Sequence, residues 1–274
     1  IKEELVQHRE DLVLEVSFKD IVERNNFKVD SFSLSEEYGT EHFSLLLYSL
    51  IRMQRPKNII ELGAGFGTTS TLMGQALKEN QKGKIWCIDN QKDWPIMKIK
   101  LEVIGENFNS YDDYFAYLIK KFELNDYMEY KKFDVDFKSP NKFFSINEPI
   151  DILFSDCGGS RAESIANSLT FYLPKMSRYS DIFIDSASTL HHGLMTLESI
   201  VNHLQKGNIP EIFLESKTDV EINKFFDFVR RSKFTLTNIA ESPEKKLHQG
   251  QNGTAWLKIE PIDIFIGNNV KNYL

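Results

Sequence analysis

Short apolar runs alternate along the chain with longer stretches in which apolar residues recur every three or four positions. The short runs predict five strands, at Asn58–Leu62, Lys84–Ile88, Met128–Phe133, Ile150–Phe154 and Asp181–Ile184. Nearly continuous apolar strands separated by helical stretches are typical of a parallel sheet covered on both faces. The pattern therefore predicts an α/β fold.

Helices are predicted between most of these strands and ahead of the first one. "SYDD", from Ser110 to Asp113, has the form of a capping box that opens a helix. Four apolar stripes at helical spacing are formed by Phe43, Leu46, Leu47 and Leu50, by Phe115, Leu118, Ile119 and Phe122, by Ile165, Leu169 and Leu173, and by Leu194, Leu197, Val201 and Leu204. Near the end, "FTLTNIAE" and "GTAWLKI" are separated only by a polar loop, which predicts an antiparallel hairpin.

No internal repeat or Pro/Gly/Ser-rich linker marks a domain boundary. We expect a helical N-terminal extension and lid over residues 1–55, a main domain over residues 56–262, and a tail over residues 263–274. The long run between the second and third predicted strands is expected to add a further element around the ligand site.

Charge and composition narrow the classes of partner. The formal net charge is -7 and the chain has no dense stripe of Lys and Arg, so a nucleic-acid partner is disfavoured. The sequence has no apolar stretch long enough to cross a bilayer and no leader, so we expect no membrane partner. Cys87 and Cys157 fit no metal or disulfide pattern, which indicates reduced thiols and a cytoplasmic protein. A composition rich in Lys, Asn, Ile and Phe is associated with bacterial genomes of high AT content.

The first predicted strand runs into the glycine-rich stretch "NIIELGAGFGTTSTLMGQAL", which reads E-x-G-x-G-x-G with Glu61, Gly63, Gly65 and Gly67. Ligands of open parallel sheets bind above the carboxyl ends of the strands, and glycines let a ligand approach the main chain there. The dinucleotide pattern is G-x-G-x-x-G, and a pyrophosphate is not favoured beside a carboxylate. Glu61 instead favours a ligand with a positive charge.

This stretch resembles motif I of the class I S-adenosylmethionine-dependent methyltransferases. The resemblance covers roughly residues 35–260. "IWCIDN" ends in Asp89, where the family binds the ribose, "KKFDVDF" contains Asp134, where it recognises adenine, and "IDILFSDCGG" contains Asp156 of motif IV. It implies a Rossmann-like, seven-stranded, mostly parallel sheet with an antiparallel last strand. S-adenosylmethionine is the implied cofactor and S-adenosylhomocysteine its product. A nucleotide-binding or dehydrogenase domain of Rossmann type is the alternative.

The resemblance also implies a set of cofactor-binding residues. They are Tyr38, Glu61, Gly63, Ala64, Gly65, Gly67, Thr68, Asp89, Asn90, Asp134, Val135 and Asp156. Tyr38 belongs to "SLSEEYGTEHFSLLLYSLI", which is similar to the opening segment of catechol-type and caffeoyl-CoA-type O-methyltransferases. Those enzymes hold Mg²⁺ with an Asp after strand four and an Asp-Asn pair after strand five. Here Asp156 and Asp185 are present, but Ser186 replaces the Asn, so we expect no metal, or one held by the two aspartates.

Four residues are candidates for catalysis. His191 and His192 follow the fifth predicted strand, and a histidine there could act as a general base, although a helix start with a surface histidine explains them as well. Arg161 could clamp a substrate carboxylate, or be a surface residue of the helix that it opens. Asp156 is the fourth candidate. "SDCGGSR" differs from the Asn/Asp-Pro-Pro-Tyr type of motif found in N6-adenine methyltransferases.

The combined interpretation is an O-methyltransferase that acts on a hydroxyl or carboxylate of a small molecule or short peptide, natural-product tailoring included. An N-methyltransferase of a small molecule and a non-catalytic module that binds S-adenosylmethionine are the alternatives. A homodimer is left open.

Overall fold

The structure is a computed structural model that describes residues 41–135, 149–157, 162–187, 191–215, 217–239 and 253–262. Most of the predicted N-terminal extension and the predicted tail therefore lie outside the described residues, as do Tyr38 and Arg161. The division into domains stays a prediction.

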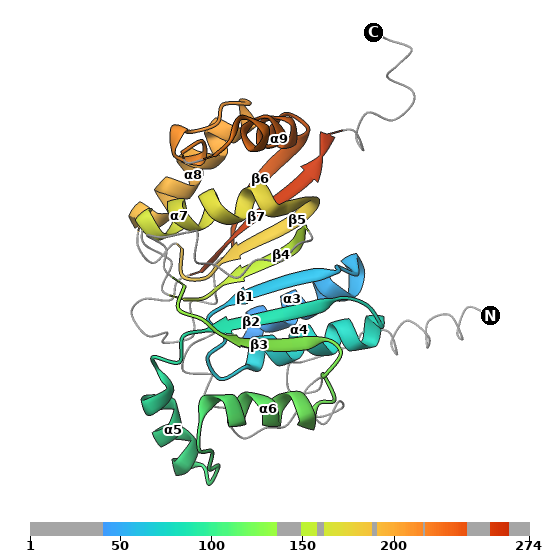
Figure 1. Cartoon of the computed structure of the whole chain (residues 1–274), viewed down its shortest axis with the longest axis vertical. Helices are drawn as coiled ribbons and strands as arrows, with labels where there is room; N and C mark the ends of the chain where they lie inside the picture. Colours follow the sequence, from blue (N-terminus) through green and yellow to red (C-terminus); the bar gives the residue numbers. More distant parts are fainter. Residues whose placement is uncertain are drawn as a thin grey trace, which may run out of the picture.

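Seven strands form one sheet in the part of the chain that the structure describes, and Figure 1 shows their arrangement. The strands are β1 (Asn58–Leu62), β2 (Lys84–Asp89), β3 (Met128–Lys132), β4 (Ile150–Ser155), β5 (Met176–Ile184), β6 (Ser232–Ile239) and β7 (Thr254–Pro261), and their order is β3-β2-β1-β4-β5-β7-β6. β1 pairs with both β2 and β4, so the strand order reverses beside it. The carboxyl end of β1 is thus the switch point, where ligands of such sheets bind.

The predicted fold class is confirmed. The pairs β1–β2, β1–β4, β2–β3 and β4–β5 are parallel, whereas β7 is antiparallel to both β5 and β6. Since β6 and β7 follow each other in the chain, they form the closing hairpin predicted from the two late apolar stretches. The one reversed strand is the last.

Helices cover both faces of the sheet. They are α3 (Glu41–Gln54), α4 (Thr68–Asn80), α5 (Trp94–Val103), α6 (Tyr111–Lys121), α7 (Ala162–Tyr172), α8 (His191–Gln205) and α9 (Asp219–Arg230), with short 3-10 turns at Leu173–Lys175 and Glu211–Phe213. Residues of α3 to α6 form one apolar cluster with Ile59 of β1, and residues of α7 to α9 form a second cluster with Ile60. Successive residues of a strand point to opposite faces, which is why β1 serves both clusters.

Among the helix starts that the structure describes, two have side-chain caps. The Ser110 hydroxyl accepts the backbone N–H of Asp113 at the start of α6, as "SYDD" predicts. Thr218 and Glu221 form a reciprocal capping box at the start of α9. Figure 1 shows α6 beside β3, with α5 next to it at the lower left.

The fifth strand differs from its prediction, because β5 begins at Met176 and not at Asp181. Its first half contains the exposed residues Arg178 and Tyr179, so it has no apolar run. Its pairing with β4 is also irregular between Ile150 and Ile152. Only the buried second half of the strand was visible in the hydrophobic pattern.

Among the described helices, none has both the length and the apolar character required to span a bilayer.

Candidate active site

A cavity of about 410 Å³ lies at the carboxyl ends of β1, β2 and β4. Most of the predicted cofactor residues line it, namely Glu61, Gly63, Ala64, Gly65, Thr68, Asp89, Asn90, Val135 and Asp156. Gly67 and Asp134 are not among the lining residues. The lining residues that were not predicted to bind the cofactor include Phe66, Thr69, Lys92, Asp93, Met97, Phe133, Phe154 and Cys157.

The three glycines of the turn are required for three different reasons. Each has a positive φ, +86° at Gly63, +50° at Gly65 and +73° at Gly67. A Cβ at Gly63 would lie 2.1 Å from the backbone oxygen of Asp156, and one at Gly67 would lie 2.6 Å from Cδ1 of Leu118. A Cβ at Gly65 would meet no atom of the described chain within 4 Å, so it would enter open space. Gly65 is therefore the glycine that leaves room for a ligand.

Asp89 holds this turn from β2. Its Oδ2 accepts the backbone N–H groups of Ala64 at 3.0 Å and Gly65 at 3.3 Å, and its Oδ1 accepts that of Gln91 at 2.7 Å. One carboxylate thus fixes two successive N–H groups of the turn and the start of the next turn. The ribose contact predicted for Asp89 stays a prediction, and Asp89 lines the cavity.

Glu61 lies beneath the turn with no exposed surface. Its Oε2 accepts the hydroxyl hydrogen of Ser70 on α4, whereas its Oε1 has no hydrogen-bond partner in the described structure. Burial raises the pKa of Glu61 to about 8, against the lowering effect of hydrogen bonds from Ser70 and Cys87. A buried carboxyl oxygen without a partner is costly, and a cationic group in the cavity would offset that cost.

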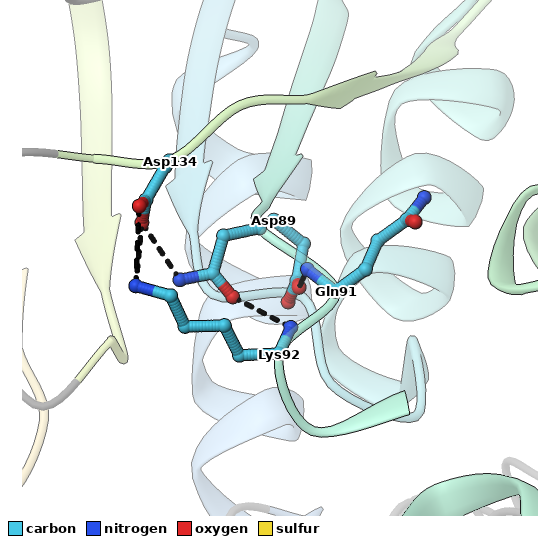
Figure 2. Close-up of polar contacts among 5 residues, drawn as sticks. Asp89, Gln91, Lys92 and Asp134 are labelled. Atoms are coloured by element: carbon cyan, nitrogen blue, oxygen red, sulfur yellow. Dashed lines mark hydrogen bonds and ion pairs between the residues drawn. The ribbon is translucent and has the colours of Figure 1, made fainter. Parts of the chain in front are cut away.

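Asn90, Lys92 and Asp134 form a polar cluster after the ends of β2 and β3. The Asp134 carboxylate accepts the Asn90 side-chain N–H at 2.9 Å and the Lys92 ammonium at 3.1 Å. Figure 2 shows Lys92 and Asp134 pointing toward each other, with Asp89 and Gln91 to their right. These donors lower the pKa of Asp134, the Asn90 side chain first. The adenine contact predicted for Asp134 stays a prediction, and this carboxylate is already engaged by two neighbouring side chains.

Asp156 and Asp185 meet at the ends of β4 and β5. Burial, then the adjacent Asp185 carboxyl, raises the pKa of Asp156 well above its usual range. Asp185 is itself buried and accepts the hydroxyl hydrogens of Ser186 at 2.7 Å and Thr254 at 3.0 Å. Ser186 has a φ of 55°, an uncommon conformation for a residue other than glycine. Among the described side chains no group of three His, Cys, Asp or Glu residues could hold a metal ion.

The candidate catalytic residues are placed unevenly. Asp156 lines the cavity, while His192 has an exposed side chain in the first turn of α8 and is not among the lining residues. The side chain of His191 and all of Arg161 lie outside the described residues. Cys157 lines the cavity, and burial raises the pKa of its thiol to about 12, so it is protonated at neutral pH. The catalytic roles of the two histidines and Arg161 stay predictions.

The residues of the cavity fit the S-adenosylmethionine that the sequence resemblance implies. Gly65 leaves open space above the turn, and Asp89 offers a carboxylate at its edge. The partnerless Oε1 of Glu61 and the buried, partnerless Oγ1 of Thr68 face the same region and can interact with an amino-acid group. Charge, space and hydrogen-bonding groups are therefore present together.

Comparisons with known proteins give one family match. Residues 60–187 match the sequence model of the family described as "Methyltransferase domain". None of the curated protein sequences that were compared matches this chain.

Similar solved structures include TomG, an O-methyltransferase of tomaymycin synthesis from Streptomyces achromogenes in complex with SAM, with 13% identity, a TM-score of 0.47 and coverage of 85% of this chain and 91% of that one. An O-methyltransferase from Bacillus cereus in complex with SAH has 13% identity, a TM-score of 0.46 and coverage of 93% and 96%. A methyltransferase from Geobacter sulfurreducens has 16% identity, a TM-score of 0.44 and coverage of 94% and 98%. The match over residues 60–187 and the Rossmann-like strand order support the resemblance to the class I S-adenosylmethionine-dependent methyltransferases.

Proposed function

We propose that this chain is an O-methyltransferase that transfers the methyl group of S-adenosylmethionine to a hydroxyl or carboxylate of a small molecule or short peptide. The observation that carries the cofactor assignment is the turn itself, where Gly65 opens onto the cavity above a buried carboxyl oxygen without a partner. When bound, S-adenosylmethionine supplies a methyl group that its sulfonium has already activated.

The cofactor would be held mainly by the wall made of β1, its turn and β2. Glu61 and Thr68 would face its amino-acid end, and Asp89 its ribose. A ribose diol is a donor of two hydrogen bonds, and a charged acceptor makes stronger hydrogen bonds than a neutral one. These residues bind and orient, and orientation is the main requirement for transfer of an activated methyl.

The acceptor would approach from the ends of β4 and β5. Asp156 is the described acidic side chain that lines this part of the cavity, and it interacts with Asp185. A hydroxyl acceptor must lose its proton as the methyl is transferred, and a carboxylate beside it can accept a hydrogen bond from that hydroxyl. A carboxylate acceptor would need no base, and the raised pKa of Asp156 favours its protonated form, which could donate a hydrogen bond to such an acceptor. The site therefore accommodates both kinds of acceptor.

The charge of the chain supports a small acceptor. The chain has a net charge of -7. A nucleic-acid substrate would require a basic surface to contact its phosphates. Cys87 and Cys157 are free thiols, which supports a cytoplasmic location; a bacterial origin remains an inference from composition.

The first experiment is a calorimetric titration of the whole chain with S-adenosylhomocysteine, with NAD and ATP as controls. We expect micromolar binding of S-adenosylhomocysteine alone. Binding of NAD or ATP in its place would overturn the cofactor assignment.

The second experiment measures methyl transfer from labelled S-adenosylmethionine to phenols, alcohols, carboxylates, amines and short peptides, with and without EDTA. Turnover with hydroxyl acceptors is expected. Turnover with amines alone would move the chemistry to nitrogen, and turnover lost with EDTA would show a metal. The variants His191→Ala and His192→Ala are measured separately. If either histidine is the general base, its replacement is expected to lower kcat by at least about tenfold.

A further inference from the structure

Two tyrosines of α6 reach across to the glycine-rich turn and bind successive carbonyl groups. The Tyr111 hydroxyl donates to the backbone oxygen of Gly65 at 2.7 Å, and the Tyr114 hydroxyl donates to that of Phe66 at 2.8 Å. Both side chains are buried, with 1% and 0% of their surfaces exposed. These contacts join the turn to a helix more than forty residues away in the sequence.

The same turn is held from the other side by Asp89. Its carboxylate accepts the N–H of Gly65, while the Tyr111 hydroxyl binds the C=O of that residue. Gly65 therefore has both of its backbone polar groups fixed by side chains from other elements. One backbone hydrogen bond within the turn, from the N–H of Gly67 to the oxygen of Ala64 at 2.8 Å, adds to this.

The two tyrosine rings are themselves fixed by aromatic neighbours. The ring of Tyr111 lies 5.6 Å from Trp94 and 5.3 Å from Tyr130, and that of Tyr114 lies 5.1 Å from Phe108, measured between centroids. Edge-to-face packing of this kind restricts ring movement. Burial, then the nearby Asp89 carboxylate, raises the pKa of Tyr111 well above its usual range, so its hydroxyl stays protonated and remains a donor.

A turn that is already in its binding conformation does not lose conformational freedom when a ligand binds. We propose that Tyr111 and Tyr114 are positioning residues that hold the glycine-rich turn in the conformation that receives the cofactor. The proposal rests on the proposed function, because the ligand of the turn is taken to be S-adenosylmethionine. It assigns a positioning role to α6, which lies between β2 and β3 in the chain.

The test removes the hydroxyl groups and keeps the rings. Tyr111→Phe, Tyr114→Phe and the double variant are compared with Tyr117→Phe, which removes a hydroxyl from the same helix. In the described structure the Tyr117 hydroxyl accepts only an exposed hydrogen bond from Lys121. Affinity for S-adenosylhomocysteine is measured by calorimetry well below the melting temperature. Hydrogen exchange of the backbone amides from Glu61 to Gly67 is measured on the same samples.

Each single variant is expected to bind about fivefold more weakly, the factor that one ordinary hydrogen bond provides. The double variant is expected to lose at least about tenfold in affinity. KM for S-adenosylmethionine should rise in parallel while KM for the acceptor stays constant. Exchange in the turn should be faster in these variants, and Tyr117→Phe should remain within about twofold of the wild type in every measurement.

Two results would overturn the proposal. The first is a lower melting temperature with unchanged affinity and unchanged exchange in the turn, which would give the hydroxyls a structural role only. The second is an equal loss of affinity in Tyr117→Phe. If the wild type binds no S-adenosylhomocysteine, the proposed function fails, and the exchange data alone then decide whether the two hydroxyls hold the turn.

Discussion

The glycine-rich turn and the cluster of Asn90, Lys92 and Asp134 line or flank the same cavity but are held in different ways. The turn is fixed by buried groups, with Asp89 on its N–H groups and the two α6 tyrosines on its carbonyls. The cluster is fixed by an ion pair whose side chains are 69% exposed at Lys92 and 61% exposed at Asp134.

This difference determines where binding free energy is expected to reside. Breaking a buried hydrogen bond leaves a polar group without water, at a cost of about 1–3 kcal/mol. An exposed ion pair contributes about 0–1 kcal/mol, because water and salt screen it. The turn should therefore be fixed and sensitive to substitution, and the exposed cluster should tolerate change.

The largest effect is expected from an alanine at the first glycine of the turn. A Cβ at Gly63 would lie 2.1 Å from the oxygen and 2.7 Å from the carbon of the Asp156 backbone, whose N–H is bonded to the oxygen of Leu62 on β1. Gly63→Ala should lower the free energy of unfolding by at least about 3 kcal/mol, which combines overpacking with the cost of a positive φ. Denaturant unfolding measures this.

Gly65→Ala is the matched control, because its Cβ meets open space. It should lower stability by only about 1 kcal/mol, while its methyl group enters the cavity and reduces affinity for S-adenosylhomocysteine more than about tenfold. Equal stability losses in the two variants would show that strand packing does not distinguish the glycines.

The second effect concerns the residue that joins the turn to β2. Asp89→Ala removes the acceptor of three backbone N–H groups and of the expected ribose contact. Affinity for S-adenosylhomocysteine should fall more than about tenfold, since charge-assisted hydrogen bonds are among the stronger ones. Asp112→Ala, which removes an exposed carboxylate that contacts Gln91, should change affinity less than about twofold. Unchanged affinity in Asp89→Ala would refute the ribose assignment.

The third effect is a dependence of stability on pH that comes from Glu61. Its pKa in the fold is about 8, above the usual carboxyl value of 4.5, so the folded protein binds more protons than the unfolded chain between these values. The free energy of unfolding should therefore fall as pH rises through this window. The glutamine in Glu61→Gln cannot ionise. The melting temperature of this variant should therefore fall less than that of the wild type as pH rises through the window.

The groups around Glu61 are Ser70, Cys87 and Asp89, and none of them supplies a positive charge. A cationic ligand in the cavity would favour the ionised carboxyl, so affinity for S-adenosylhomocysteine should rise between pH 6 and pH 8 in the wild type and less in Glu61→Gln. Parallel melting curves of the two proteins over the whole window would show that Glu61 is already ionised in the fold.

Much of the structure around the glycine-rich turn could be predicted from sequence, because the signals for each element are local. β1 has the predicted bounds, and Asp89 ends β2 as the apolar run before it indicated. The capping signal of Ser110 likewise belongs to its own helix. Where the whole pattern lies within one element, the sequence was enough to predict where that element begins or ends.

What the sequence could not show depends on how distant elements meet. The three glycines have equal spacing in the sequence, but only the pairing of β1 with β4 makes Gly63 a packing requirement. The apolar stripe of α6 predicted which face of the helix is buried. It did not predict that the tyrosine hydroxyls of this helix bind carbonyl groups of the turn. The prediction for Asp134 came from the resemblance, and the contact with Lys92 depends on two turns that meet in space.

The smallest effect is expected in the exposed cluster. If Asp134 faces the adenine as the resemblance implies, the Lys92 ammonium competes with the ligand for that carboxylate. Lys92→Met should then raise affinity for S-adenosylhomocysteine and Asp134→Ala should lower it, each by no more than about threefold, because exposed pairs contribute less than about 1 kcal/mol. Calorimetry at low and high salt measures both variants, and the effect of Lys92→Met should shrink as salt screens the pair. A loss of affinity in both variants would mean that the ion pair itself orders the wall. A change of tenfold in either variant would break the comparison, since the exposed cluster would then contribute as much to binding as the buried turn.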